Sequence, residues 1–72
     1  MSSCDVRLNT ITKIKEFVEA LKTQEGEFTL SCGRYTTDAR SIMGIFSLDL
    51  SKPIHLTAKS GQIPETVKPF LA

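Results

Sequence analysis

The chain has 72 residues, which is enough for one domain but too short for a deep, enclosed active site, because a domain of this size buries only ~60% of its unfolded surface. Nine Lys and Arg against eight Asp and Glu give a formal net charge of +1, far from the basic balance of a nucleic-acid-binding protein. The sequence contains neither a secretory signal pattern at its start nor an apolar run of membrane-spanning length. We expect one cytoplasmic domain over residues 1–72, with no direct nucleic-acid binding and no membrane insertion.

A strand and an amphipathic helix are predicted first. Val6 to Leu8 is predicted as a short strand, and Asn9 or Thr10 as the N-cap of the first helix. This helix is predicted from Ile11 to Lys22, and Gly26 is predicted to end it. Its apolar positions at helical spacing are Ile11, Ile14, Phe17, Val18 and Leu21.

A β-hairpin is predicted next. Apolar and polar residues alternate from Glu27 to Cys32, with Phe28 and Leu30 facing one way, as in a half-buried strand. Gly33-Arg34 then offers a two-residue turn into a second strand, Tyr35-Thr36-Thr37.

The rest of the chain predicts a second helix, a strand and a terminal helix. The helix starts at Ser41, and Pro53 opens a strand that runs to about Ala58. Ser60-Gly61 is predicted to turn the chain, and Pro64 to start a short helix. That terminal helix carries Val67, Phe70 and Leu71. The order β-α-β-β-α-β plus a short helix predicts an α+β fold: an open-faced sandwich with helices on one face of a four-stranded, mostly antiparallel sheet.

The residues with metal-binding or redox chemistry are few. Cys4 and Cys32 are expected to be reduced thiols of a cytoplasmic protein, with a redox pair or a metal site as the lesser alternatives. His55 alternates with Ile54 and Leu56, so its side chain is expected on the sheet face opposite the core rather than in a catalytic or ligand role. No metal and no cofactor is predicted.

The segment from Asp38 to Leu48 carries most of the functional information. Ser41 precedes the apolar residues Ile42, Met43, Ile45, Phe46 and Leu48, so it is a natural N-cap whose Oγ accepts from amides two or three residues on. A phosphate on that oxygen would lie at the positive end of the helix dipole. A plain capping role for Ser41 remains an alternative interpretation.

These residues resemble a known family. Ser41-Ile42-Met43-Gly44, with Ser47-Leu48 one turn later, is similar to the regulatory-serine segment of HPr, the small phosphocarrier of the bacterial phosphoenolpyruvate-dependent sugar phosphotransferase system. The resemblance extends without a gap from the first predicted helix through the Gly33-Arg34 turn to the strand Ile54 to Ala58. It implies the HPr type of open-faced sandwich, although the terminal helix is shorter than is usual in that family.

The chain departs from the family at the phosphocarrier site. HPr proteins carry a Gly-Leu/Ile-His-Ala-Arg-Pro segment at the start of the first helix, and its histidine takes the phosphoryl group from enzyme I. Thr10 stands where the histidine would be, Thr12 where the arginine would be, and Lys13 replaces the proline. A threonine phosphoester is too stable to be passed on efficiently, so no catalytic residue is predicted.

The second site of the family is retained. In HPr proteins of low-GC Gram-positive bacteria the equivalent serine is phosphorylated by a dedicated kinase, and the product is a corepressor for a transcriptional regulator of carbon use. The resemblance therefore implies a non-catalytic regulatory protein with Ser41 as the modification site and Arg40 as a charge partner of the phosphate. Ile42, Met43 and Phe46 would form part of the docking patch.

The partners implied are an HPr-kinase-like kinase, phosphotransferase-system proteins or that transcriptional regulator. Two other functions stay open: a phosphocarrier with an unconventional acceptor, and an HPr-fold binding module outside sugar transport. A degenerate copy whose role the sequence does not reveal is a further alternative.

Overall fold

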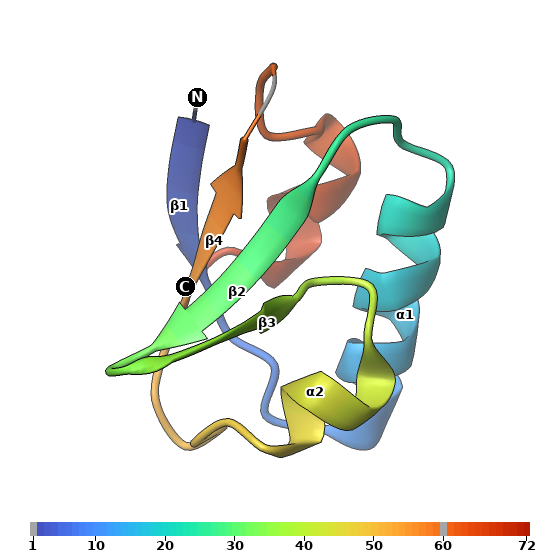
Figure 1. The fold of residues 1–72 in the computed structure, drawn as a ribbon. Coiled ribbons are helices and arrows are strands. Elements are labelled where there is room, and N and C mark those ends of the chain that lie inside the picture. The colour runs from blue at the N-terminus through green and yellow to red at the C-terminus, as the bar shows by residue number, and fades with distance from the viewer. Residues whose placement is uncertain (1, 60) are drawn as a thin grey trace.

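The computed structural model describes residues 2–59 and 61–72, so the predicted turn at Ser60-Gly61 lies partly outside the described residues. Figure 1 shows the arrangement of the elements. They are β1 (Ser2–Val6), α1 (Ile11–Lys22), β2 (Phe28–Cys32), β3 (Tyr35–Asp38), α2 (Ile42–Phe46), β4 (Ile54–Ala58) and a terminal 3₁₀ helix, η1 (Glu65–Phe70). The α+β prediction and the element order are confirmed.

The four strands form one sheet in the order β1-β4-β2-β3, and every neighbouring pair is antiparallel. The hairpin forms at Gly33-Arg34 as predicted, with Cys32 opposite Tyr35. Gly33 has a φ of +62°, a conformation that favours glycine in such turns.

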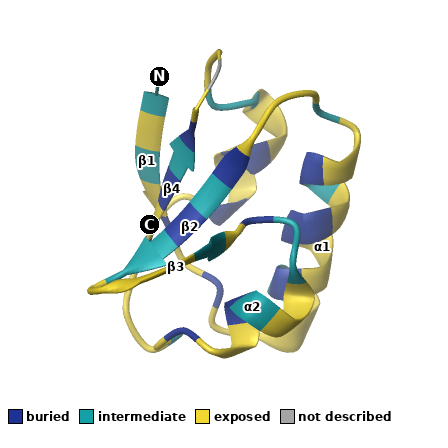
Figure 2. Cartoon of the chain, in the orientation of Figure 1, coloured by how far each residue is buried: buried dark blue, intermediate teal, exposed yellow. Residues whose placement is uncertain are grey.

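One face of the sheet lies on the core and the other is open to solvent. Ile54, Leu56 and Ala58 of β4 are buried, whereas His55 between them is exposed. Figure 2 shows the buried side of α1 turned toward the sheet. The core residues of the two helices that cover this face include Ile14, Phe17, Val18, Leu21, Val67 and Phe70. The rings of Phe17 and Phe70 meet edge to face, with their centroids 5.5 Å apart.

The first strand lies earlier in the chain than predicted. It runs from Ser2 to Val6, paired with β4 from Ala58 back to Ile54. Pro53, the residue before β4, has no N–H to donate, in keeping with the end of the ladder at the Val6–Ile54 pair. Leu8 is buried beyond the strand, on the way into α1.

The bounds of α1 are those predicted, Ile11 to Lys22, but Ile11 and Gly26 have other roles than expected. Ile11 is 60% exposed and does not belong to the core. The helix ends at Lys22 with Thr23 as its C-cap, because the chain turns there. Gly26 has a φ of +98° and lies in the turn to β2, four residues beyond the last helical residue.

The last residues of the chain extend the sheet by a short antiparallel contact. Leu71 is bridged to Val6, the amide of Arg7 donates to the Phe70 carbonyl at 2.8 Å, and the amide of Ala72 donates to the Asp5 carbonyl at 3.0 Å. The terminal helix starts after Pro64 as predicted, but it is 3₁₀ in type and ends at Phe70. Leu71, which is predicted to lie in it, follows the helix in extended conformation and pairs with β1 instead.

Candidate docking and modification surface

The segment between β3 and α2 is anchored before the helix begins. Ala39 is fully buried, and its amide donates to the Phe28 carbonyl at 3.0 Å. Asp38 accepts twice: its Oδ1 from the Arg40 amide at 2.9 Å, and its carbonyl from the Ser41 amide at 3.1 Å. These contacts fix where α2 starts relative to the sheet.

Ser41 is the N-cap of α2, as predicted. Its backbone is extended, with φ −98° and ψ 106°, and its Oγ accepts from the Gly44 amide at 3.1 Å. The Ser41 carbonyl accepts from Ile45 at 2.9 Å, the first backbone hydrogen bond of the helix. The hydroxyl proton is not needed for the cap, so the oxygen can satisfy Gly44 and still carry chemistry of its own.

The apolar residues of α2 divide between core and solvent. Ile45 is fully buried, and Leu48 just after the helix is also buried. Ile42, Met43 and Phe46 are 37%, 81% and 47% exposed. We call these three side chains the α2 patch. A five-residue helix that buries one of its own side chains and exposes three large apolar ones is unusual for a surface element.

The α2 patch lies outside the two depressions described on the surface of residues 2–59 and 61–72. One depression of about 370 Å³ lies between the β2–β3 strands and Arg40, and another of about 600 Å³ lies between α1 and η1. Neither is lined by a residue of the α2 patch. Side chains that project outside such depressions suit contact with a macromolecule better than enclosure of a small ligand.

Gly44 allows α2 to approach β3 closely. A Cβ on this residue would lie 2.0 Å from Thr37 Oγ1 and 3.1 Å from Thr37 Cβ. Any larger residue would push α2 away from the strand or force Thr37 to move. Glycine therefore sets the position of the helix here, although its φ is not in the left-handed region.

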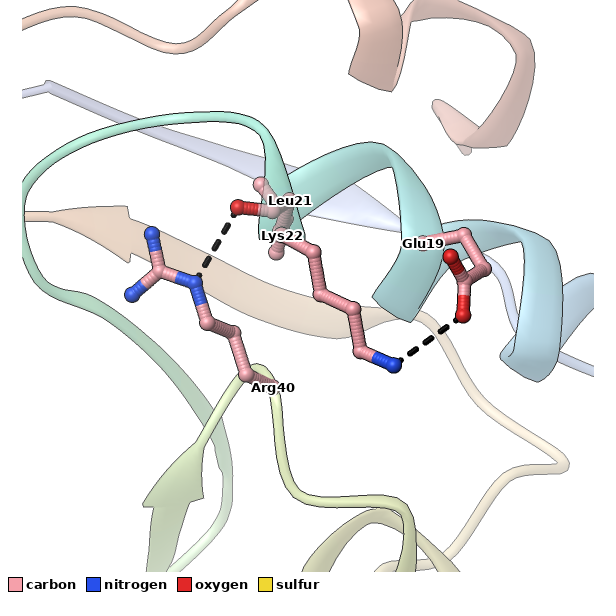
Figure 3. Close-up of polar contacts among 4 residues, drawn as sticks. All are labelled: Glu19, Leu21, Lys22 and Arg40. Atoms are coloured by element: carbon pink, nitrogen blue, oxygen red, sulfur yellow. Dashed lines mark hydrogen bonds and ion pairs between the residues drawn. The ribbon is translucent and has the colours of Figure 1, made fainter.

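Arg40 does not lie free beside Ser41, and its part as a charge partner of a phosphate there stays a prediction. Its Nε donates to the Leu21 carbonyl at 3.1 Å, and its two Nη atoms donate to the carbonyls of Gly26 and Gln24. Figure 3 shows the Nε contact, with the side chain directed at the end of α1. The guanidinium carbon also lies 5.1 Å from the centre of the Phe28 ring. A cation is stabilised there because unpaired carbonyls gather at a helix C-terminus.

Thr10 and Thr12, which the resemblance to HPr aligns with phosphocarrier positions, have ordinary structural roles. Thr10 Oγ1 accepts from the Lys13 amide at 3.1 Å and caps α1, with φ −137° and ψ 155°. Thr12 is an exposed residue of the first turn. On the outer face of the same helix Lys22 and Glu19 pair at 3.0 Å (Figure 3). These contacts assign no chemistry to Thr10 or Thr12.

His55 is exposed on the open face as predicted, and it has a partner that sequence reasoning missed. Its Nδ1 lies 3.0 Å from Asp5 Oδ1, because Asp5 and His55 are directly opposite in the β1–β4 pairing. A first strand over Val6 to Leu8 leaves Asp5 outside the sheet, so the prediction could not include this pair.

Cys4 and Cys32 are both free, and burial together with the Asp5 carboxylate raises the pKa of Cys4. Over residues 2–59 and 61–72 no three His, Cys, Asp or Glu side chains gather as a metal site would require.

Among the described helices, none combines the length and the apolar character needed to cross a membrane. Comparisons of the chain with models of protein families, with curated proteins and with solved structures found no match. Any functional assignment therefore rests on the residues of the chain itself.

Proposed function

We propose that this chain is a non-catalytic, HPr-like regulatory protein that binds a protein partner through the α2 patch, with Ser41 as its phosphorylation site. The exposure of Ile42, Met43 and Phe46 outside any described depression is the observation that carries the proposal. Aromatic residues and Met are enriched at protein interfaces, where their side chains adapt to the partner surface.

The HPr type of fold is part of the same proposal. A β-α-β-β-α-β order with a four-stranded antiparallel sheet is what the resemblance implies, and the chain has both features. Ser41 at the start of α2 also agrees with the place of the regulatory serine in that family. The partner we expect is a transcriptional regulator or another protein of the phosphotransferase system, acting in the cytoplasm.

Phosphorylation of Ser41 would add charge beside the α2 patch. A phosphoserine carries about −1.5 to −2 charge at pH 7 and three strong acceptor oxygens, which suit the amides of the first helical turn. Because Arg40 is engaged by the α1 carbonyls, a partner that recognises the modified protein would have to supply most of the cationic contacts.

Intact-mass measurement after incubation with an HPr kinase and ATP tests the modification. We expect one phosphate on the wild type and none on Ser41→Ala, with Ser47→Ala as the matched control because Ser47 caps the other end of α2. An unmodified wild type, or a modified Ser41→Ala, would contradict the assignment of Ser41.

Binding to a regulator that recognises serine-phosphorylated HPr tests the docking surface. We expect Met43→Glu, at the most exposed position of the α2 patch, to abolish binding while the domain stays folded. Ile11→Glu is the control, since Ile11 is an exposed apolar residue on α1. Equal binding of the two variants would count against the α2 patch.

The main alternative is a phosphocarrier with an unconventional acceptor, and one observation bears on it. His55 is the chain's one histidine, its side chain is 49% exposed, and Asp5 holds its Nδ1, leaving Nε2 as the nitrogen for nucleophilic chemistry. Incubation with phosphoenolpyruvate and enzyme I separates the two functions. Acid-labile label that is lost in His55→Gln would establish the carrier and contradict the non-catalytic proposal.

A further inference from the structure

We propose that Arg40 couples the turn after α1 to the start of α2, so that the order of the turn sets the order of the docking surface. This inference rests on the proposed function only for its biological meaning. The coupling itself is a property of the free protein and is measured without a partner.

Arg40 links the start of α2 to the turn after α1 through three side-chain hydrogen bonds. It leaves the backbone directly before the N-cap of α2, and its guanidinium binds carbonyls of Leu21, Gln24 and Gly26. The three acceptors belong to the last turn of α1 and to the loop that leads into β2. One planar guanidinium group therefore joins the loop before α2 to the loop after α1, and its three acceptors lie 14 to 19 residues before Arg40 in the sequence.

The start of α2 depends on such outside support. A helix of five residues is too short to be stable by itself, because nucleation is unfavourable and few hydrogen bonds follow it. Ala39 and Asp38 hold the backbone before the helix, and Arg40 adds the contact with the far connection. Loss of that contact leaves α2 packed on β3 and on α1 and anchored by the buried Ile45, with more freedom to open at its start.

The turn depends on Arg40 in return. The Leu21 carbonyl also accepts from the amides of Thr23 and Gln24. The carbonyls of Gln24 and Gly26, by contrast, accept from the Nη atoms of Arg40. A glycine with φ +98° shapes the turn where these carbonyls are presented. Because a coupling free energy acts equally in both directions, a change in the turn should be detected at α2.

Amide hydrogen exchange in four forms of the protein tests the coupling: wild type, Gly26→Ala, Arg40→Met, and both together. Ile45 and Leu48 report on α2, because their amides donate to Ser41 and Ile45. Gln24 reports on the turn, because its amide donates to Leu21. Alanine strains the left-handed backbone at position 26, and methionine keeps an apolar stem while removing the guanidinium.

We expect Gly26→Ala to speed exchange at Ile45 and Leu48 about tenfold in the wild-type background and to have almost no effect on them in Arg40→Met, because the link is then already cut. Arg40→Met alone should speed exchange at both the turn and α2. The same acceleration by Gly26→Ala in both backgrounds, or none at α2 in the wild type, would overturn the proposal.

Two controls separate coupling from general loosening. D-alanine at position 26, introduced by chemical synthesis of the chain, adds the same methyl group but suits a positive φ, so it should leave α2 unchanged. Arg34→Met removes an exposed arginine of the hairpin turn and should also leave α2 unchanged. If Gly26→Ala does not fold, Gly26→Asn takes its place, since asparagine tolerates left-handed backbone better. Acceleration at α2 by D-alanine or by Arg34→Met would count against a specific role for Arg40.

A failure of this test and a failure of the proposed function are distinguishable. If Gly26→Ala does not change exchange at α2 but a partner still binds the α2 patch, the proposed function stands and Arg40 has no part in it. Coupling without any partner binding would keep Arg40 as a conformational link and remove the docking function.

Discussion

The two α-helices of the domain begin in the same way and differ beyond their first turn. Thr10 and Ser41 both have extended backbones, and each hydroxyl accepts from the amide three residues on at 3.1 Å. Beyond the cap, α1 buries four side chains in twelve residues, whereas α2 buries one in five and exposes three large apolar ones. The capping hydroxyl by itself is therefore no sign of function, and the exposed apolar patch is what distinguishes α2.

The largest expected difference between the helices concerns their phenylalanines. Phe17 of α1 is fully buried against Phe70, and Phe46 of α2 is 47% exposed. We expect Phe17→Ala to lower the free energy of unfolding by about 3 to 5 kcal/mol, and Phe46→Ala to cost about 1 kcal/mol or less. Urea denaturation measures both, with Phe17→Leu as a milder variant if alanine prevents folding. Equal losses would mean that Phe46 belongs to the core and not to a docking surface.

Gly44→Ala sharpens the comparison through the position of α2. Helix propensity alone predicts that alanine stabilises an α-helix by up to ~1 kcal/mol relative to glycine. The close approach to Thr37 predicts the reverse, a loss of about 1 to 3 kcal/mol in the free energy of unfolding. Thr37→Ala in the same chain should recover much of that loss, because it removes the oxygen that the new methyl group meets. A stabilised Gly44→Ala single variant would contradict the packing of α2 on β3.

The two caps provide a more direct comparison. Thr10→Ala and Ser41→Ala each leave one first-turn amide without its acceptor, so we expect each to cost about 1 kcal/mol in thermal or urea unfolding. Only Ser41→Ala should also remove phosphorylation by the kinase. A much larger loss of stability for Ser41→Ala would show that the serine does more for the fold than a cap does.

The smallest expected effect concerns the turn after α2. Ser51 donates to Asp49 Oδ1 from its hydroxyl at 2.6 Å and from its amide at 3.1 Å, and these hydrogen bonds lower the pKa of Asp49. A lowered pKa in the folded state adds stability that is present at neutral pH and is lost as the pH falls through the folded pKa. We expect Ser51→Ala to raise the pKa of Asp49 in an NMR titration of its carboxyl carbon. An unchanged titration would mean that the hydroxyl does not hold the carboxylate in solution.

The turns after α1 and after α2 are held by hydrogen bonds of different kinds. A distant arginine adds three hydrogen bonds to the local ones of the turn after α1, whereas the side-chain hydrogen bonds of the turn after α2 come from neighbours within its own sequence. Local hydrogen bonds of this second kind can be predicted from Asp-x-Ser spacing. No local pattern indicates that Arg40 would point to Leu21.

Elements whose signals lie within a few residues of one another can be predicted from the chain before it is folded. The spacing of Ile14, Phe17, Val18 and Leu21 predicts α1, Gly33-Arg34 predicts the hairpin, and Thr10 and Ser41 predict the caps, because periodicity, turn chemistry and capping act within a few residues. The residues of the α2 patch can be identified from the sequence too, since that helix has more apolar residues than one buried face can hold.

Tertiary structure decided what depends on contacts between distant segments. The span of β1 is set by its pairing with β4, which ends with Val6 opposite Ile54, and the Asp5–His55 pair results from that register. Gly44 is needed because α2 lies close to Thr37. The direction of the Arg40 side chain is set by three carbonyls that precede the β2–β3 hairpin in the sequence. A long, flexible cation can reach many acceptors, and only the packed chain selects among them.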